Sequence, residues 1–579
     1  MRRRNFLRSI AISSGVLASA PIVKATDLRN ILPNDELLPL KNRSFSADLI
    51  IGGGGLGGCA AALAALRNGL WVIMTEETDW IGGQLTQQGL SCPDENPWIE
   101  TIGGTRSYRD LRTAIREYYR NHYPLTTQAK SNQYLNPGNG SVSRLCHEPR
   151  VALAILMELM NPYLSSGRLI LLLQHKIIAA DVDGDQIRSV KAQDLKTGEE
   201  RILSAPYFID ATELGDLLPL TGTEFVTGAE SKKQTKELHA AEKADPGNQQ
   251  AFTLCFAMDY LPGTNNIIDK PKEYTFWKNY IPQLTPPWSG KLLDLKYISP
   301  RNLKPKALGF NPAGAPADDM LNLWNYRRII DQANFKSGFY LGGITIVNWP
   351  QNDFLLGNLV GLNGKEYKKT IERAEQLDLS LFYWLQTEVP HADGKSGWPG
   401  LRLRGDIMGT ETGLAKYPYV RESRRINAVF TVLEEHVGIE NRNLVTGKKE
   451  GNHAAFFYDS VGIGSYSIDL HPTSAGNNYI DIGTYPFQIP LGALLPVRMQ
   501  NLIPACLNIG TTHITNGCYR LHPIEWNIGE SAGMLVAYSL RNKIALHGVR
   551  ASPDKLKDFQ DFIRSQGIAT QWPKDIVSY

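Results

Sequence analysis

Short apolar runs, separated by polar and glycine-rich segments, set the pattern of the first half of the chain. Residues 49–51 and 71–75 predict buried strands, and the alanine-rich segment between them, residues 59–65, predicts a helix. Further apolar runs at residues 169–173 and 207–209 predict two more strands. A strand, a helix and a second strand in this order are typical of an α/β fold, in which helices cover a parallel sheet.

A similar pattern returns near the C-terminus. Residues 501–505 form another apolar run, and residues 524–539 predict a helix. We therefore predict that the parallel-sheet domain is discontinuous and that an α+β substrate domain, which caps it, is inserted between its two parts. The predicted division is a sheet domain of residues 46–228 and 486–547, a cap domain of residues 229–485, and a C-terminal helix within residues 548–579.

A glycine-rich turn joins the first strand to the alanine-rich helix. Its spacing is Gly-x-Gly-x-x-Gly, and its glycines are Gly52, Gly53, Gly54 and Gly57. Glycine here permits a tight turn, lets a pyrophosphate approach the backbone, and lets the helix pack closely. Glu76 ends the second strand, 24 residues after Gly52, where its carboxylate can accept hydrogen bonds from ribose hydroxyls. The motif predicts a dinucleotide site, with Glu77 as the alternative acid.

Two further segments resemble those that contact FAD in two-domain flavoproteins. Gly82-Gly83-Gln84 follows the acidic residue, and Asp210-Ala211-Thr212-Glu213 follows the strand at residues 207–209. With these motifs, residues 46–540 resemble the FAD-dependent oxidoreductase family of the glutathione-reductase-type flavoproteins. The resemblance implies a Rossmann-like FAD-binding domain. It further implies that Gly83 and Gln84 run along the pyrophosphate, that Asp210 and Ala211 contact the nucleotide, and that the backbone of Ile177 contacts adenine. Glu213 departs from the glycine that is usual in these proteins.

The first residues predict export. Arg2, Arg3 and Arg4 precede Phe6-Leu7-Arg8 and a short apolar segment rich in small residues, as in a secretory signal. The paired arginines resemble the twin-arginine type, which implies that the protein folds around its cofactor before it is exported. We expect residues 1–25 to be the signal peptide, and the mature chain to be periplasmic or otherwise exported, without a stable membrane span.

Composition and charge narrow the range of partners. The chain has 61 Lys and Arg residues against 58 Asp and Glu residues, so no net charge attracts it to nucleic acid. Six scattered cysteines form no Cys-x-x-Cys motif and predict no bound metal, iron–sulfur cluster or haem. We therefore predict a small-molecule substrate, and oxygen, a quinone or a separate electron carrier as the electron acceptor.

Candidate catalytic residues occur in two segments. The first precedes the helix predicted at residues 524–539 and contains His513, Arg520 and His522, which we expect in one loop. Here His522 is the predicted general base and Arg520 the anion binder, while the alternative for His522 is a ring that caps the helix through backbone hydrogen bonds. Asp469 and His471 form the second candidate, because alternate residues of a strand point to one face. That pair could also be only a polar face with a salt bridge.

Together these features predict an exported FAD-dependent dehydrogenase or oxidase. It would remove a hydride from a C–H bond next to a hydroxyl or an amine of a small organic substrate. Two alternatives stay open. In the first, the enzyme reduces an activated double bond with electrons from a partner. In the second, the chain is a non-redox FAD-binding protein that takes part in envelope assembly or binds carbohydrate.

Overall fold

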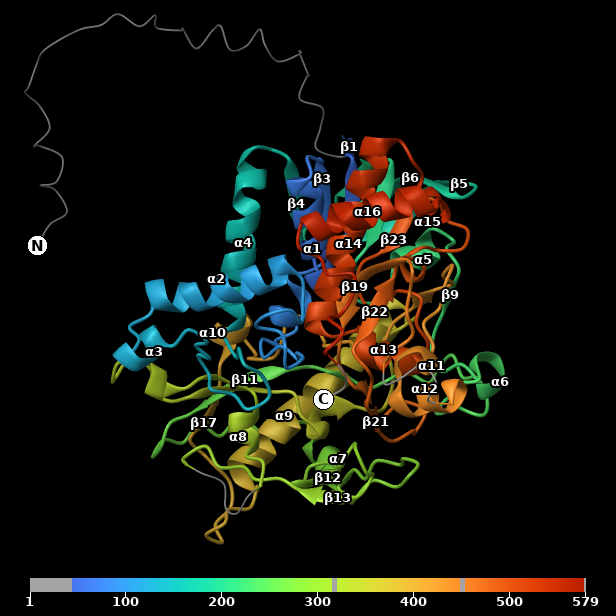
Figure 1. The fold of residues 1–579 in the computed structure, drawn as a ribbon. Helices are drawn as coiled ribbons and strands as arrows, with labels where there is room; N and C mark the ends of the chain where they lie inside the picture. Colours follow the sequence, from blue (N-terminus) through green and yellow to red (C-terminus); the bar gives the residue numbers. More distant parts are fainter. Residues whose placement is uncertain (1–43, 315–319, 448–452, 577–579) are drawn as a thin grey trace, which may run out of the picture.

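A five-stranded parallel sheet forms the framework of the upper half of the molecule (Figure 1). The structure is a computed structural model that describes residues 44–314, 320–447 and 453–576. All neighbouring strands of this sheet run parallel, which confirms the predicted α/β class. In spatial order the strands are β23 (Leu502–Pro504), β8 (Tyr207–Asp210), β2 (Leu49–Gly52), β3 (Val72–Glu76) and β4 (Leu169–Leu173).

Both faces of this sheet are covered, which explains why its strands are apolar almost throughout. Leu49 and Ile51 pack in one core with α1 (Leu56–Arg67), whereas Ile50 points to the other face and packs in a second core. That second core is closed by a four-stranded sheet, which also contributes Ile177. Its strands, in spatial order, are β1 (Ser44–Ser46), β7 (Glu200–Ser204), β6 (Gln186–Asp194) and β5 (His175–Asp183).

Two helices from opposite ends of the chain, α1 and α14 (His522–Asn542), pack against each other at very short range. A Cβ atom on Gly529 would lie 2.0 Å from the carbonyl oxygen of Gly57, and one on Gly533 would lie 2.3 Å from that of Ala61. Only glycine at these positions allows such an approach. The N-terminus of α14 is thereby held beside the glycine-rich turn.

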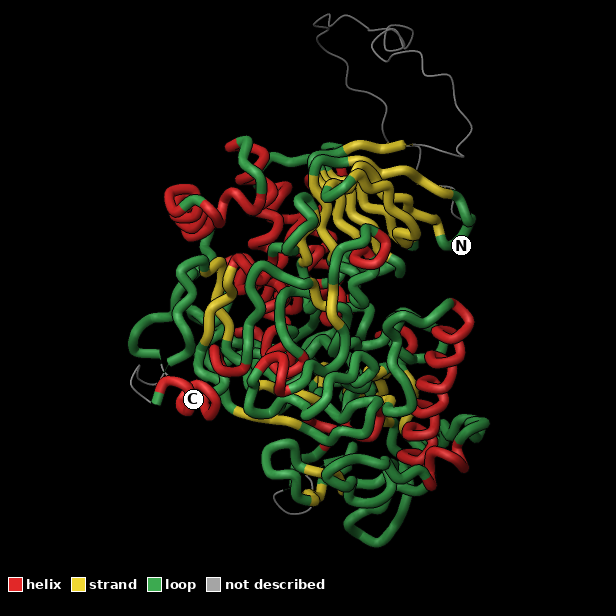
Figure 2. The backbone as a smooth tube through the Cα atoms, turned by 90° about the vertical axis from the view of Figure 1, so that its right-hand side faces the viewer, coloured by secondary structure: helices red, strands yellow, loops and turns green. Residues whose placement is uncertain are grey.

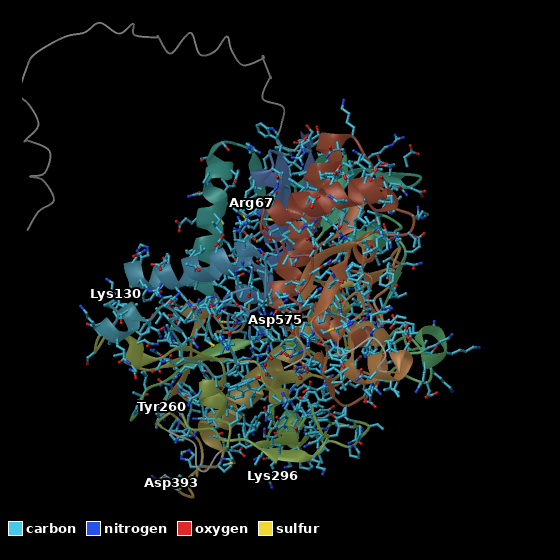
Figure 3. All side chains as sticks on the ribbon, viewed as in Figure 1. Arg67, Lys130, Tyr260, Lys296, Asp393 and Asp575 are labelled. Atoms are coloured by element: carbon cyan, nitrogen blue, oxygen red, sulfur yellow. The ribbon has the colours of Figure 1, made fainter. Side chains whose placement is uncertain are left out.

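The lower half of the molecule is built on a four-stranded antiparallel sheet (Figure 1). The long helix α9 (Gly364–Thr387) packs on this sheet, where the ring of Phe382 contacts that of Phe256. Long loops connect the elements of this half (Figure 2). Tyr260 and Asp393 lie here, apart from Arg67 at the end of α1 (Figure 3). The strands, in spatial order, are β14 (Arg328–Ile330), β15 (Ile344–Val347), β11 (Phe256–Tyr260) and β17 (Leu401–Leu403).

Apart from the pair of β12 (Lys296–Ile298) and β13 (Pro305–Ala307), the described residues form four small two-stranded sheets, most of which join segments distant in the sequence. They pair β10 (Phe252–Thr253) with β16 (Asp353–Phe354), β20 (Ile468–Leu470) with β21 (Ile480–Ile482), β9 (Phe225–Val226) with β18 (Arg425–Ile426), and β19 (Ser460–Gly464) with β22 (Phe487–Pro490). The last two pairs cross the domain limits predicted at residues 228 and 486. The division into a sheet domain and a cap domain stays a prediction.

Of the two expectations about the chain ends, only the C-terminal helix falls within the described residues. The predicted C-terminal helix is α16 (Pro553–Ser565), and the side chain of Ser552 caps it by accepting a hydrogen bond from the amide of Lys555. The expected signal peptide, residues 1–25, lies outside the described residues. Within the described ranges, no helix has both the length and the apolar character needed to cross a membrane.

We expect Gly529→Ala to destabilise the protein by about 1–3 kcal/mol, because the new methyl group forces α1 and α14 apart. Alanine by itself favours a helix by about 1 kcal/mol, so a loss of stability reports the packing. The measurement is the midpoint of urea unfolding. Gly364→Ala is the control, since no atom lies within 4 Å of its Cβ position. Equal midpoints for Gly529→Ala and the wild type would contradict the close contact.

Candidate functional site

The glycine-rich turn and the end of β3 form a small pocket at the carboxyl edge of the parallel sheet. The amide of Gly54 donates a hydrogen bond to Glu76 Oε2 (3.0 Å), and the amide of Thr78 donates one to Oε1 (2.7 Å). Burial raises the pKa of Glu76 to about 7. Four predicted cofactor residues from different segments line this pocket together: Gly53, Glu76, Ile177 and Ala211. The rival acid, Glu77, lines it too, but its carboxylate pairs with Lys176 Nζ at 2.9 Å.

Other predicted cofactor residues shape the turn. A Cβ atom on Gly57 would lie 1.7 Å from the carbonyl oxygen of Ala505, so this glycine lets α1 pack on the end of β23. Side chains also surround the Cβ positions of Gly52 and Gly54 at 2.8 and 3.0 Å. Asp210 is fully buried, and its carboxylate accepts hydrogen bonds from the amides of Thr212 (3.0 Å) and Leu217 (3.1 Å). Asp210 therefore fixes the chain after β8, and its contact with the nucleotide stays a prediction.

Gly83 and Gln84 lie against the start of α1. A Cβ atom on Gly83 would lie 2.7 Å from the amide nitrogen of Leu56, and Glu213 Oε1 is 2.8 Å from the Cβ position of Gly55. Both carboxyl oxygens of Glu213 and Oε1 of Gln84 are buried without a hydrogen-bond partner among the described residues. Burial raises the pKa of Glu213 well above its ordinary value, which favours a neutral carboxyl that can donate a hydrogen bond.

These orphaned atoms fit a polar ligand at the turn, because buried polar groups in native proteins nearly always have partners. The glycine cradle and the acid at the end of β3 are the residue types that hold the pyrophosphate and the adenosine ribose of FAD. The residues present are therefore compatible with the predicted cofactor. Within the same described ranges, no group of three or more His, Cys, Asp or Glu side chains is arranged to hold a metal ion.

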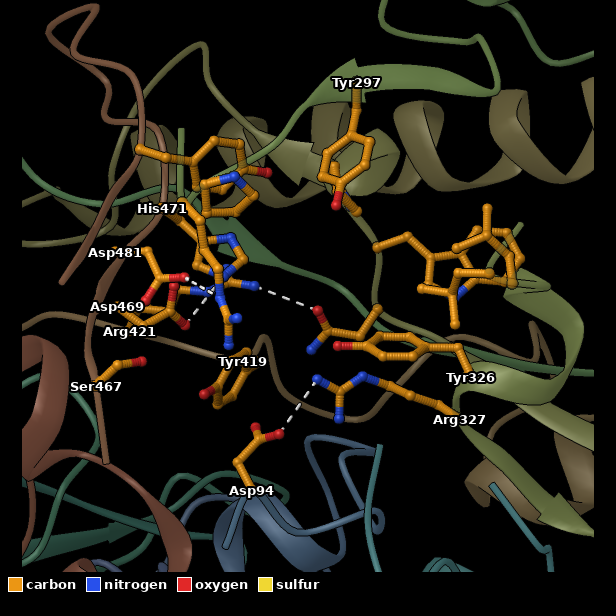
Figure 4. Close-up of a pocket in the computed structure, with 18 of the residues that line it drawn as sticks. Asp94, Tyr297, Tyr326, Arg327, Tyr419, Arg421, Ser467, Asp469, His471 and Asp481 are labelled. Atoms are coloured by element: carbon orange, nitrogen blue, oxygen red, sulfur yellow. Dashed lines mark hydrogen bonds and ion pairs between the residues drawn. The ribbon is translucent and has the colours of Figure 1, made fainter. Parts of the chain in front are cut away.

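A larger cavity of about 320 Å³ is lined by residues of both halves of the molecule (Figure 4), and one of them, Arg520, connects it to the Gly83–Gln84 segment. Gln84 Nε2 donates a hydrogen bond to the carbonyl oxygen of Arg520 (2.9 Å), whose side chain lines the cavity. Arg520 Nη1 donates to the hydroxyl of Tyr419 (2.7 Å), and its Nη2 donates to the carbonyl oxygen of Asp469 (3.0 Å). The segment that fits FAD and the wall of the cavity are thus directly connected.

His471 and Asp469 both line this cavity; Asp469 belongs to β20, and His471 directly follows that strand. His471 Nδ1 lies 2.6 Å from Asp353 Oδ2, and its Nε2 lies 3.7 Å from Asp469 Oδ2. Asp353 is almost fully buried, and its Oδ1 also accepts a hydrogen bond from Thr253 Oγ1 (2.7 Å). Burial acts to raise the pKa of Asp353, but the neighbouring Arg421 and His471 outweigh it and hold that pKa below its ordinary value. An ionised carboxylate thus orients the His471 ring.

The structure does not give His522 the setting expected of a general base. Its ring is completely buried, Nδ1 accepts a hydrogen bond from the amide of Asp94 (3.1 Å), and Nε2 lies 3.2 Å from the carbonyl oxygen of Leu90. Burial lowers the pKa of His522 to about 4. Both ring nitrogens are therefore occupied by backbone groups, which favours the structural alternative stated for this residue.

His513 is also separated from the larger cavity. The expected single loop is in fact a helix, α13 (His513–Tyr519), which places His513 and Arg520 at opposite ends. His513 Nδ1 lies 2.9 Å from both carboxylate oxygens of Glu422, and its ring lines a second cavity of about 210 Å³. The second cavity shares His471 with the first.

Sequence reasoning missed Arg327 and Asp94, which line the cavity, and Asp353, which lies behind its wall against His471. Each is a single polar residue in a segment without a recognisable motif. They meet only because β16, β14 and the chain after Gln84 converge on one place. No local signal in the sequence could have indicated this.

Comparison with protein families gives one match. The sequence profile of a family described as FAD dependent oxidoreductase matches residues 48–562. A comparison with curated protein sequences finds no match.

Comparison with solved structures gives similarities at low identity. A geranylgeranyl bacteriochlorophyll reductase-like protein from Thermoplasma acidophilum is 11% identical, with 91% of this chain and 85% of that chain covered and a TM-score of 0.30. The flavin-dependent monooxygenase PieE, in complex with FAD and substrate, is 12% identical with 37% and 35% covered and a TM-score of 0.22. L-proline dehydrogenase from P. horikoshii is 14% identical with 32% and 24% covered and a TM-score of 0.17.

The chain thus spans only 24% of the proline dehydrogenase and 35% of the monooxygenase. At these identities and scores, the similarities give no information about the reaction of this chain.

We expect Glu76→Gln to weaken FAD binding about 10-fold or more, because an amide replaces one carboxylate oxygen that would accept from the ribose. FAD titration of apo-protein, followed by quenching of flavin fluorescence, measures the change. Glu77→Gln is the matched control, since its carboxylate pairs with Lys176. A larger loss in Glu77→Gln than in Glu76→Gln would transfer the ribose contact to Glu77.

Proposed function

The chain belongs to the family of FAD-dependent oxidoreductases, and from this premise we propose that it removes a hydride from a C–H bond next to a hydroxyl or an amine, with His471 as the base. The protein is an FAD-dependent oxidoreductase enzyme that acts on a small molecule. The observation that supports the finer proposal is the hydrogen bond between His471 and the buried carboxylate of Asp353, in the wall of a cavity that adjoins the FAD-binding segment.

The cofactor would be held by residues at the edge of the parallel sheet. Glu76 would accept hydrogen bonds from the adenosine ribose, and the turn at residues 52–57 would contact the pyrophosphate. Gly83 and the neutral carboxyl of Glu213 would face the same phosphates. When bound, FAD supplies the acceptor for the hydride that leaves the substrate.

His471 is our candidate for the group that takes the proton. The carboxylate of Asp353 at 2.6 Å accepts a hydrogen bond from Nδ1, so the Nδ1 proton is fixed and Nε2 keeps a free lone pair. A substrate hydroxyl or amine can transfer its proton to Nε2. The O–H or N–H bond and the neighbouring C–H bond then break together, and a carbonyl or an imine forms. The negative charges of Asp353 and Asp469 stabilise the resulting imidazolium.

Arg520 and Tyr419 are candidates for holding the substrate oxygen. The Tyr419 hydroxyl accepts a hydrogen bond from Arg520 Nη1 at 2.7 Å and is therefore free to donate its own proton. Arg520 Nε is buried without a partner in the described part of the chain. Both groups line the cavity that His471 lines, so a substrate oxygen between them can be bound and oriented for proton transfer.

Three further parts of the proposal rest on the sequence motifs alone. Residues 1–25 serve as a twin-arginine signal, and the enzyme works after export. The FAD-binding domain is of the glutathione-reductase type. Oxygen, a quinone or a separate carrier protein would be the final electron acceptor.

We expect His471→Ala to retain FAD but to slow flavin reduction by about 10²–10⁴-fold, the usual range for a general base. The measurement is anaerobic stopped-flow absorbance, with whichever compound in a panel of alcohols, sugars, hydroxy acids and amines bleaches the wild-type flavin. Asp353→Asn should slow the same step, because the amide no longer orients the ring.

His522→Ala is the control. It should lose stability through the two lost hydrogen bonds while keeping the rate of reduction nearly intact. A large slowing in folded His522→Ala, together with a normal rate in His471→Ala, would return the role of the base to His522.

A further inference from the structure

The wall of the cavity alternates cationic and anionic side chains. Every guanidinium group there has a carboxylate within 4 Å, so the charges form pairs. These pairs are Arg421–Asp353 (3.1 Å), Arg520–Asp469 (3.4 Å), Arg327–Asp94 (3.6 Å) and Arg301–Asp481 (3.7 Å). Asp353 does not itself line the cavity, but with this buried carboxylate behind Arg421 each guanidinium group of the wall has an anionic partner, so little uncompensated charge is offered to a ligand.

This balance disfavours a charged substrate. A carboxylate that entered the cavity would lose its hydration and would meet guanidinium groups that are already neutralised by their own partners. An ammonium group would meet the same difficulty with the aspartates. A hydroxyl group differs, because it donates one hydrogen bond and accepts up to two, and so it can use both members of an ion pair.

Buried donors without partners point to what the cavity binds. Arg327 Nε, Arg520 Nε and the hydroxyl of Tyr479 are buried and have no hydrogen-bond partner within the described ranges. The three residues are 7%, 2% and 3% exposed, and all three line the cavity. Buried polar groups rarely lack a hydrogen-bond partner, so we expect a ligand to supply acceptor oxygens to these donors.

Acceptors stand across the cavity from Arg327 (Figure 4). Asp469 of β20 lies directly opposite Asp481 of β21 in the register of the two strands, and both line the cavity. Figure 4 shows these two carboxylates and His471 on one side of the cavity, facing Arg327 and the hydroxyl of Tyr326 on the other. Adjacent carboxylates can accept hydrogen bonds from neighbouring hydroxyls of one ligand.

We infer that the cavity binds a neutral polyhydroxylated compound, a monosaccharide or a linear sugar alcohol, and that it discriminates against acidic counterparts of the same compounds. The volume of about 320 Å³ lies at the small end of the range for ligand pockets, about 300–1,000 Å³, and fits a single sugar unit. The inference rests on the proposed function for its chemistry. One hydroxyl of the ligand gives its proton to His471 Nε2 and the carbon that carries it gives its hydride to FAD, which leaves a carbonyl group.

The test uses the FAD-loaded protein under anaerobic conditions. The probes are D-glucose, D-galactose, D-xylose, D-sorbitol and myo-inositol, with D-glucuronate and D-galacturonate as acidic counterparts and D-glucosamine as a cationic one. Binding is measured by isothermal titration calorimetry and, separately, flavin bleaching by absorbance. We expect at least one neutral probe to bind and to bleach the flavin, and its uronate to bind at least 10-fold more weakly.

Asp481→Asn tests the carboxylate pair. It should weaken binding of the neutral probe about 10- to 100-fold, because a hydrogen bond to a charged acceptor is lost, while FAD content stays unchanged. Asp393→Asn is the matched control, since Asp393 is an exposed residue that does not line this cavity (Figure 3). Equal weakening in the two variants would overturn the assignment of the carboxylates.

The outcomes separate the two proposals. Bleaching by an acid or an amine, with no binding of any neutral probe, overturns the inferred substrate class and supports the proposed function. Binding of a neutral probe to this cavity without bleaching by any compound supports the substrate class and overturns the proposed function. Failure of all probes both to bind and to bleach overturns the inference.

Discussion

The contact between α1 and α14 determines where the other functional parts lie. Gly57 and Gly529 bring the two backbones together, and no residue with a side chain would allow this distance. The same contact fixes the first turn of α14, whose Glu525 accepts a hydrogen bond from the amide of Gly57 (3.1 Å). Arg520, just before α14, is thereby held beside Gln84. A steric constraint between two helices therefore connects the glycine-rich turn to the wall of the cavity.

Around the cavity, ion pairs and hydrogen bonds, more than apolar packing, fix the positions of the side chains. Charged side chains are removed from water there, and each must be compensated by a neighbour. Asp353 has three partners at once: its carboxylate binds Thr253, pairs with Arg421 and orients His471. A change at such a residue alters several partners at once, so it is expected to lower both the stability of the protein and the rate of the chemical step.

The framework could be predicted from the sequence because its signals are local. The apolar runs at residues 49–51, 71–75 and 169–173 are strands of the parallel sheet, since strands covered on both faces must be apolar. The pair Asp469 and His471 was found for a similar reason, the two-residue period of a strand. The buried setting of His522 could not be foreseen, because it depends on Asp94 and Leu90, more than 400 residues away. Asp353 could not be found at all, since its role is created only by tertiary contacts.

The wide separation in sequence of the segments that meet at Gly57 has a consequence for biosynthesis. The amide of Gly57 and the carboxylate of Glu525 are 468 residues apart. At a synthesis rate of about 5–20 residues per second, roughly 20–90 s pass between the emergence of α1 from the ribosome and that of α14. During this interval the alanine-rich surface of α1 has no helix to cover it, and β8 lacks its neighbour β23. Slower translation lengthens the time for which this apolar surface and the unpaired edge of β8 are exposed, and with it the opportunity for the nascent chain to aggregate.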